Sequence, residues 1–185
     1  MAAAKSGRID ICVANAGDVL VEDFATSLED DWHAQVDVNL LGVMRTWQAA
    51  LPFMGSVNGG RLIAVSSAAG VRGEPHIPTY SATKAAISGL VQALALKYAL
   101  RSITVNCVAP GEIETMLNQE GRRQVAALTN APPEAILQEL VEKHIPLGRL
   151  GRADEVAKLI AYLASHEAAY ITGQTPVLDG GQLLT

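Results

Sequence analysis

Residues 61–70, "RLIAVSSAAG", read as a buried strand that ends in a turn of small residues. The apolar residues of this run do not alternate with polar ones, which is typical of a strand covered on both faces. Three other runs have the same character: "IDICVA" (9–14), "ITVNCV" (103–108) and "TPVLD" (175–179). The sequence therefore predicts four short strands inside a globular domain.

Longer helical patterns separate these strands. One spans residues 27–54 and opens with Ser27 in the N-cap position. A second spans 79–100 and follows Pro78, a residue that suits the first turn of a helix, and a third spans 153–165. Strands that alternate with such helices form a parallel sheet with helices on both faces. We therefore predict an α/β fold with a doubly wound parallel sheet, as a single domain over residues 1–185.

Small, glycine-containing turns follow three of the predicted strands. They are "NAG" (15–17), "SSAAG" (66–70) and "APGEIET" (109–115). The carboxyl ends of parallel strands share one edge of the sheet, and ligands bind beyond that edge in folds of this class. The polar groups of these turns should therefore converge on one site.

Tyr80 and Lys84 lie one helical turn apart at the start of the helix predicted over 79–100. A nearby ammonium and the positive end of the helix both favour the phenolate, so they should lower the pKa of the tyrosine. Such a pair can serve as a general acid and base. The same spacing also occurs where an amphipathic tyrosine simply lies beside a solvated lysine.

Polar residues near the predicted sheet edge favour the catalytic interpretation of this pair. Ser67 lies on the turn after a buried strand, where its hydroxyl can reach a substrate oxygen. Asn39 lies in the apolar part of the first long helix, where asparagine is disfavoured unless it is hydrogen-bonded. The turn "APGEIET" adds backbone donors and Thr115.

Composition and charge exclude several classes of protein. Hydrophobic residues make up 49% of the 185 residues, and the net charge is −5 with a pI near 5.3, which argues against a nucleic-acid-binding surface. No apolar run is long enough to span a membrane, and the start, "MAAAKSGRID", has no signal-peptide core. We therefore expect a cytoplasmic protein. The four histidines show no metal-ligand spacing, so no metal is expected.

Several motifs occur together in one order: "NAG" (15–17), "VNLLG" (38–42), "SSAAG" (66–70), the Tyr80–Lys84 pair, "VAPGEIET" (108–115) and "ITGQTPVLDGG" (171–181). In this order and spacing the chain resembles the classical short-chain dehydrogenases/reductases, from about Gly7 to Gly181. The part from "PLGRLGRADEVAKLIAYLAS" (146–165) onward is most similar to the branch with 3-oxoacyl-acyl-carrier-protein reductases and many sugar, polyol and alcohol dehydrogenases. The resemblance implies a Rossmann-like fold.

The resemblance also implies roles for individual residues. Tyr80 would be the acid in carbonyl reduction and the base in alcohol oxidation, and Lys84 would lower the tyrosine pKa and hold the nicotinamide ribose. Ser67 would polarise the carbonyl, and Asn39 would hold a water of the proton relay. The residues that would contact the cofactor, NAD or NADP, are Asn15, Ala16, Gly17, Val65, Tyr80, Lys84, Pro110, Gly111, Ile113 and Thr115.

One departure from the family is an absence. None of the 16 glycines forms G-x-G-x-x-G or the family's T-G-x-x-x-G-x-G, so the glycine-rich turn that binds the pyrophosphate is missing. The strand at 9–14 would correspond to the family's fourth, and residues 1–7 to the end of the preceding helix. We therefore expect an N-terminally shortened, C-terminal part of the fold. The strand at 9–14 becomes an edge with uncovered apolar faces, cofactor affinity drops, and the choice between NAD and NADP stays open.

The resemblance makes residues 112–150 the substrate lid and places Arg72, Glu74 and His76 at the pocket entrance. An acyl-carrier-protein partner would need a basic patch, for which Arg61 and Arg101 are the candidates. The helix at 79–100 has almost no polar face, so it is covered either by its own chain or by a second subunit. We expect a homodimer or homotetramer formed through the helices at 79–100 and 27–54.

The function predicted from these features is that of an NAD(P)-dependent oxidoreductase, which interconverts a ketone and a secondary alcohol through Asn39, Ser67, Tyr80 and Lys84. An alternative is a catalytically silent relative that acts in binding or assembly, favoured by the missing nucleotide-binding half. A sugar-nucleotide epimerase or dehydratase shares the Tyr-x-x-x-Lys motif, but such enzymes carry a larger C-terminal substrate domain.

Overall fold

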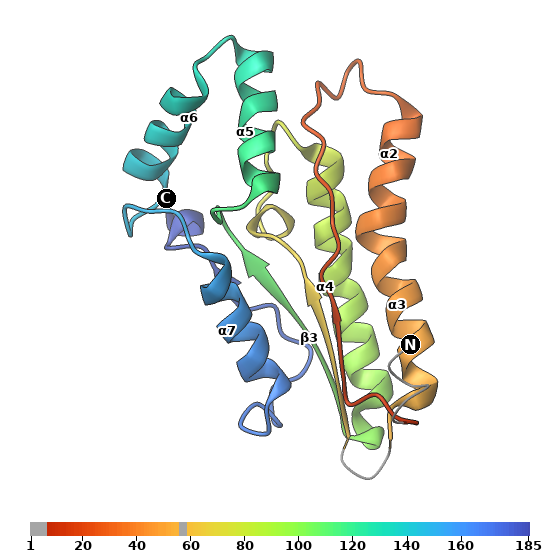
Figure 1. Ribbon diagram of the computed structural model, residues 1–185. Coiled ribbons are helices and arrows are strands. Elements are labelled where there is room, and N and C mark those ends of the chain that lie inside the picture. The colour runs from red at the N-terminus through yellow and green to blue at the C-terminus, as the bar shows by residue number, and fades with distance from the viewer. Residues whose placement is uncertain (1–6, 56–58) are drawn as a thin grey trace.

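Four strands form one parallel sheet in the order β1–β2–β3–β4 (Figure 1). The computed structural model describes residues 7–55 and 59–185. The helix end expected in residues 1–7 lies outside these residues, apart from Gly7. The strands are β1 (Ile11–Ala14), β2 (Gly60–Val65), β3 (Ile103–Pro110) and β4 (Val177–Leu178). Each falls within two residues of a predicted run, which confirms the α/β fold with a parallel sheet.

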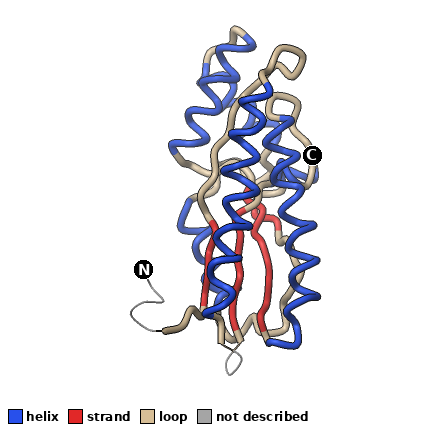
Figure 2. The backbone as a smooth tube through the Cα atoms, turned by 90° about the vertical axis from the view of Figure 1, so that its right-hand side faces the viewer, coloured by secondary structure: helices blue, strands red, loops and turns tan. Residues whose placement is uncertain are grey.

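Helices cover both faces of the sheet, as predicted. On one face lie α2 (Glu29–Val36), α3 (Gly42–Ala50) and α4 (Pro78–Tyr98), and on the other lies α7 (Ala153–Ala164) (Figures 1 and 2). Alternate residues of β2 point to opposite faces, so Leu62 joins the core under α3 and α4 while Ile63 packs in a second core with Leu163 of α7. Within the described residues, no helix combines the length and the apolar character needed to cross a bilayer.

The segment predicted as the lid contains two helices that stand beyond the carboxyl ends of the strands (Figure 1). They are α5 (Met116–Thr129) and α6 (Pro133–Glu139), and a π-helical turn at Leu140–His144 follows α6. The side chain of Thr115 caps α5 by accepting a hydrogen bond from the Asn118 amide at 3.3 Å. The loop ends of the strands and these two helices therefore enclose the space where the polar turns meet.

The helix predicted over 27–54 is divided by local hydrogen bonding. A π-helical turn at Asp37–Leu41 separates α2 from α3, and a 3-10 turn at Leu51–Phe53 ends the segment. The prediction of Ser27 as the N-cap is wrong, because Leu28 occupies that position without a side-chain cap. Ser27 Oγ instead accepts a hydrogen bond from the Trp32 indole at 2.9 Å and donates one to the carbonyl of Phe24.

Strand β1 lies at the edge of the sheet, as predicted, and one of its two faces is bare. Ile11 and Val13 are 49% and 39% exposed, because α7 does not reach this strand. The opposite face is covered: Cys12 and Ala14 pack in the core under α3. The expectation of uncovered apolar faces therefore holds for one face and is wrong for the other.

Helix α4 is capped by a residue from a distant part of the chain. Its N-cap position, Ile77, offers no side-chain acceptor, and Pro78 follows at the first helical position. The carboxylate of Glu22, which is 6% exposed, accepts a hydrogen bond from the backbone N–H of Thr79 at 3.0 Å. The Glu22 N–H in turn donates to the carbonyl of His76 at 2.9 Å. The loop after β1 thereby fixes the start of the helix that carries Tyr80 and Lys84.

Glu22→Ala should lower the free energy of unfolding by about 1–2 kcal/mol, because it leaves a helix N-terminal amide without an acceptor. Glu22→Gln keeps an acceptor oxygen and should lose less. Glu29→Ala removes a carboxylate that is 78% exposed and is the matched control, with an expected change within about 0.5 kcal/mol. Urea denaturation followed by circular dichroism measures all three, and equal losses for Glu22→Ala and Glu29→Ala would contradict the assignment.

Candidate active site

One cleft at the carboxyl ends of the strands brings together every residue predicted to contact a cofactor. The cleft has a volume of about 480 Å³. It is lined by Asn15, Ala16, Gly17, Val65, Tyr80, Lys84, Pro110, Gly111, Ile113 and Thr115, together with Ser67. We call it the strand-end cleft. The roles of these residues stay predictions, but their convergence follows from the shared edge of the parallel strands.

Sequence reasoning missed the wall of the strand-end cleft that α7 provides. Ala153, Val156, Ala157 and Ile160 of this helix line the cleft. Their spacing of three and four residues places them on one side of the helix, so the pattern was visible in the sequence. What the sequence did not show is that this side faces the strand ends as well as the sheet.

Lys84 lies in the interior of the strand-end cleft with only 3% of its surface exposed. Its ammonium donates a hydrogen bond to the carbonyl of Val65 at 2.9 Å and lies 5.4 Å from the centre of the Tyr80 ring. Burial lowers the pKa of Lys84 to about 8. Gly17 borders the same space: a Cβ there would lie 3.1 Å from Asn39 Oδ1 and 3.2 Å from Lys84 Nζ. The turn after β1 therefore leaves room beside the ammonium that a side chain would fill.

Tyr80 is partly buried and lines both cavities together with Ser67. Burial raises the pKa of Tyr80, a hydrogen bond with Ser67 lowers it, and the charge of Glu112 raises it again, so that it lies above its usual value. The net shift is therefore opposite in direction to the expected lowering, because the loss of solvent dominates the pKa of Tyr80. Ser67 Oγ also accepts a hydrogen bond from the Ala69 amide at 3.2 Å, which orients the hydroxyl.

Asn39 is fully buried within the π-helical turn Asp37–Leu41. Its side-chain oxygen accepts from the Asp18 N–H at 3.0 Å, and its amide nitrogen donates to the Asp18 carbonyl at 2.8 Å. These two bonds satisfy the polar group that the sequence placed in an apolar helix, and they fix the loop after β1 next to Gly17. That Asn39 holds a water stays a prediction, and its side chain is already used in these bonds.

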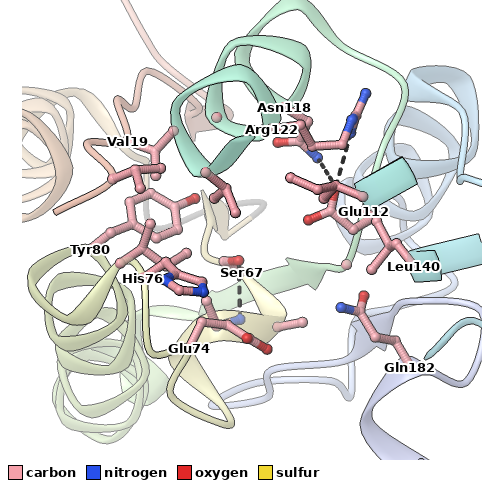
Figure 3. Close-up of a pocket in the computed structure, with 18 residues that line it drawn as sticks. Val19, Ser67, Glu74, His76, Tyr80, Glu112, Asn118, Arg122, Leu140 and Gln182 are labelled. Carbon is pink, nitrogen blue, oxygen red and sulfur yellow. Dashed lines mark hydrogen bonds and ion pairs between the residues drawn. The ribbon is translucent and has the colours of Figure 1, made fainter. Parts of the chain in front are cut away.

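A second cavity, of about 250 Å³, adjoins the strand-end cleft and opens under α5 and α6. We call it the lid cavity. It shares Ser67, Tyr80, Gly111 and Asn118 with the strand-end cleft, so the two spaces meet at the serine and tyrosine hydroxyls (Figure 3). Its other lining residues are Val19, Val21, Ala68, Ala69, Glu74, His76, Ile77, Glu112, Gly121, Arg122, Val125, Ile136, Leu140 and Gln182.

Three arginines that the sequence analysis placed at functional surfaces have structural roles. Glu74 and His76 line the lid cavity as expected, but Arg72 donates to the backbone carbonyls of Thr185 and Gln182 instead. Arg61 is buried and donates to the Ser165 carbonyl. Arg101 donates to the carbonyls of Leu51 and Met54. A basic patch made by Arg61 and Arg101 is therefore contradicted, because both guanidinium groups bind backbone carbonyls of their own chain.

The described residues contain no group of three or more His, Cys, Asp or Glu side chains that could hold a metal ion. The Ser67 and Tyr80 hydroxyls lie at the junction of the two cavities, and the buried Lys84 ammonium lies beside them in the strand-end cleft.

The burial of Lys84 predicts a pH dependence of stability. Its folded-state pKa of about 8 lies below the ordinary value of 10.5, so between these values the unfolded chain binds more protons and the free energy of unfolding should rise with pH. The slope is up to about 1.4 kcal/mol per pH unit. The raised pKa values of Cys12, Cys107 and Tyr80 act in the opposite sense, so the contribution of Lys84 must be isolated by comparison with a variant.

Urea denaturation of the wild type and of Lys84→Met at several pH values from 7.5 to 10 makes that comparison. The stability of the wild type should increase relative to Lys84→Met as the pH rises. Lys97→Met, which removes an exposed ammonium from the same helix, is the control. Parallel pH curves for the wild type and Lys84→Met would contradict a buried ammonium.

A parallel sheet with helices on both faces, and a cleft at its strand ends that holds a tyrosine, a lysine and a serine, defines the class of Rossmann-like oxidoreductases. Comparison with known proteins gives the family within that class. The sequence matches the family described as "Enoyl-(Acyl carrier protein) reductase" over residues 1–182. The chain therefore belongs to the short-chain dehydrogenase/reductase family, as predicted.

Individual relatives agree with this assignment. The chain is 39% identical over 180 residues to the 3-oxoacyl-[acyl-carrier-protein] reductase FabG of Thermotoga maritima, a match that covers 97% of this chain and 68% of the relative. It is 40% identical over 181 residues to the oxidoreductase UcpA of Escherichia coli K12, covering 97% and 67%. The crystal structure of levodione reductase matches with a TM-score of 0.91 at 28% identity and covers 99% of this chain and 70% of that one. The chain thus spans about two thirds of the length of these relatives.

Proposed function

We propose that this chain carries the reaction centre of an NAD(P)-dependent reductase that interconverts a ketone and a secondary alcohol. One observation supports this most directly: the strand-end cleft and the lid cavity meet at Ser67 and Tyr80. A dinucleotide in the first space and a carbonyl compound in the second would therefore lie against the same two hydroxyls.

The strand-end cleft fits the nicotinamide–ribose end of a dinucleotide. Its volume is about 480 Å³, it contains the buried ammonium of Lys84, and Gly17 keeps the space beside that ammonium open. When bound there, NAD(H) or NADP(H) supplies or accepts the hydride. The residues expected to hold it are those that line the cleft: Asn15, Ala16, Gly17, Val65, Tyr80, Lys84, Pro110, Gly111, Ile113 and Thr115.

In the direction of reduction, the Tyr80 hydroxyl donates its proton to the carbonyl oxygen as negative charge develops on that oxygen. The Ser67 hydroxyl donates a hydrogen bond to the same oxygen and stabilises it. The Lys84 ammonium, 5.4 Å from the phenol ring, stabilises the phenolate that remains. In oxidation, the Tyr80 phenolate takes the proton of the alcohol. Tyrosine has an ordinary pKa near 10, and in this site the pKa is raised, so Tyr80 is protonated at neutral pH, as its role as the acid in reduction requires.

We also propose that copies of the chain associate through α4 and α3 as a homodimer or homotetramer. The side of α4 that faces away from the sheet carries small exposed residues: Ala82, Ala85, Ala86, Gly89 and Ala93. Leu96 and Leu100 extend this surface and are 83% and 103% exposed, and Met44 of α3 is 43% exposed. Small residues permit close helix packing, and a two-fold contact would cover both copies of the surface at once. Sedimentation equilibrium would show a mass above the 19.5 kDa of one chain.

The proposed function is tested by adding NADH, NADPH, NAD and NADP separately to the chain and measuring its melting temperature, followed by turnover of a panel of small ketones. We expect a rise in melting temperature with at least one reduced cofactor, and consumption of that cofactor with a ketone. The absence of both effects would overturn the proposal for this chain and favour the alternative, a silent relative that acts in binding or assembly.

A further inference from the structure

The carboxylate of Glu112, in the lid cavity, has no role in the proposed reaction. Glu112 follows Gly111 directly, in the loop after β3, and its side chain is 29% exposed. Its Oε2 atom accepts hydrogen bonds from Arg122 Nη1 at 3.2 Å and from Asn118 Nδ2 at 3.3 Å. Both partners come from α5, so the lid helix holds this carboxylate against the cavity.

The second oxygen of Glu112 has no partner. Among the residues that the structure describes, no donor bonds to Oε1, and Figure 3 shows both bonds converging on one oxygen while the other is turned toward the interior of the cavity. Glu112 and Tyr80 line the same cavity, so the carboxylate lies near the reacting hydroxyl. Glu112 Oε1, an acceptor without a donor, therefore points toward the space that a substrate at Tyr80 would occupy.

The charges around the lid cavity favour a hydrogen-bond donor over an anion. The lining contains two carboxylates, Glu112 and Glu74, and one guanidinium, Arg122, which is already paired with Glu112. Burial raises the pKa of Glu112, its pairing with Arg122 lowers it, and the charge of Glu74 raises it further. The imidazole of His76 also lines the cavity. A carboxylate or phosphate that entered would meet two like charges.

The remainder of the lining limits the size and character of the substrate. Aliphatic side chains from the loop after β1 and from the predicted lid segment form a large part of the wall: Val19, Val21, Val125, Ile136 and Leu140. A volume of about 250 Å³ lies at the small end of ligand cavities. The cavity therefore suits a short aliphatic compound with one polar end besides the reacting carbonyl.

We propose that the lid cavity selects small, uncharged ketones and secondary alcohols that carry a second hydroxyl group, and that Glu112 Oε1 accepts the hydrogen bond of that hydroxyl. This inference rests on the proposed function and adds its substrate class. Glu112 is the specificity-determining residue, and Arg122 and Asn118 hold its carboxylate in position. A hydrogen bond between a neutral donor and a charged acceptor changes kcat/KM by about 10- to 100-fold.

Three ketones with the same four-carbon chain test the proposal: 4-hydroxy-2-butanone, 2-butanone and acetoacetate end in a hydroxyl, a hydrogen and a carboxylate. The wild type should reduce 4-hydroxy-2-butanone with a kcat/KM at least about 10-fold above that for 2-butanone, with acetoacetate the poorest. In Glu112→Leu the preference for 4-hydroxy-2-butanone over 2-butanone should disappear. Acetoacetate should gain at least about 10-fold, because Arg122 is then free to bind a carboxylate.

Glu114→Gln is the matched control, since Glu114 is exposed, lies two residues further along the same loop and lines neither cavity. Equal kcat/KM for 4-hydroxy-2-butanone and 2-butanone in the wild type, or an unchanged preference in Glu112→Leu, would overturn the inference.

A binding measurement without cofactor separates this inference from the proposed function. Saturation-transfer NMR with 1,3-butanediol and with 3-hydroxybutyrate should show contact between the wild type and the diol only, and a weaker diol signal with Glu112→Leu. Binding of the diol without any turnover would overturn the proposed function and support the cavity preference. Preferential binding of 3-hydroxybutyrate, or no binding of the diol, would overturn the inference itself.

Discussion

Tyr80→Phe is expected to lower kcat for ketone reduction by about 10²–10⁴-fold, the range that a single general acid contributes. The tyrosine hydroxyl lies where the strand-end cleft and the lid cavity meet, and Ser67 has its own hydrogen bond from the Ala69 amide. In Tyr80→Phe the serine hydroxyl can still polarise the carbonyl, but the phenol proton is no longer there to be donated. Removing the phenol oxygen should therefore affect kcat much more than KM.

Initial rates of NADH or NADPH consumption measure this effect, with Tyr98→Phe as the matched control. Tyr98 lies on the same helix, at its far end, and contacts Lys97 and Arg101 instead of either cavity. Its variant should keep the wild-type rate. The melting temperature of Tyr80→Phe should remain close to that of the wild type, so that the loss is not one of folding. A Tyr80→Phe variant with more than a third of the wild-type kcat would remove Tyr80 from the mechanism.

The pH profile gives a second readout of the same residue. Reduction requires a protonated Tyr80 and oxidation an ionised one, so reduction should slow and oxidation should accelerate as the pH rises toward the pKa of Tyr80. Because that pKa is raised, mainly by burial, the change should occur on the alkaline side of the ordinary tyrosine value. Both dependences should vanish in Tyr80→Phe.

Gly70→Ala is expected to lower the free energy of unfolding by about 3 kcal/mol, at the upper end of the usual cost of overpacking. The loop after β2 lies directly against the backbone of α4 at this point. A Cβ on Gly70 would lie 2.6 Å from the Lys84 carbonyl carbon and 2.8 Å from the Ala85 nitrogen. Neither is a flexible side-chain atom, so the loop and the helix must separate. The φ angle of Gly70 is not positive, so the requirement for glycine here is one of space.

The same substitution should also reduce catalysis, because the contact sets the distance between the two proposed catalytic elements. Ser66 Oγ donates to the Lys84 carbonyl at 2.9 Å, and Ser67 is the next residue. A displaced loop would move the Ser67 hydroxyl away from Tyr80. Gly73→Ala is the matched control, since a Cβ on Gly73, in the same loop, would meet nothing within 4 Å. Urea denaturation and kcat/KM of both variants test the argument, and similar stability of the two would contradict it.

The strand-end cleft could be located from the sequence, because its position is determined by the topology of the sheet. Asn15, Ser67 and Thr115 each follow an apolar strand, and parallel strands deliver such residues to a common edge. That Tyr80 and Lys84 lie close together follows from helical spacing. These positions need no knowledge of how individual side chains pack.

The lid cavity could not be derived in the same way. Glu112 and Arg122 both lie in the predicted lid segment, and no motif in the sequence indicates that they pair. Their pairing depends on how α5 lies over the strand ends, which is fixed by contacts such as the 3.2 Å bond from the Val21 amide to Gln124. The predicted lowering of the Tyr80 pKa was wrong for a related reason. Burial by segments distant in sequence raises this pKa and outweighs the local effect of Lys84.

The two edge strands of the sheet, β1 and β4, differ in how well each could pair with an additional strand. β4 has only two residues, and the chain turns immediately after it at Gly180 and Gly181, where φ is +65° and +91°. β1 offers a longer margin, with Ile11 and Val13 on an open face beside it. The sheet can therefore be extended more readily at one edge than at the other. A strand added beside β1 would form backbone hydrogen bonds and would also cover an apolar surface. A strand added beside β4 could pair with only two residues. An engineered fusion meant to enlarge the sheet belongs on the β1 side.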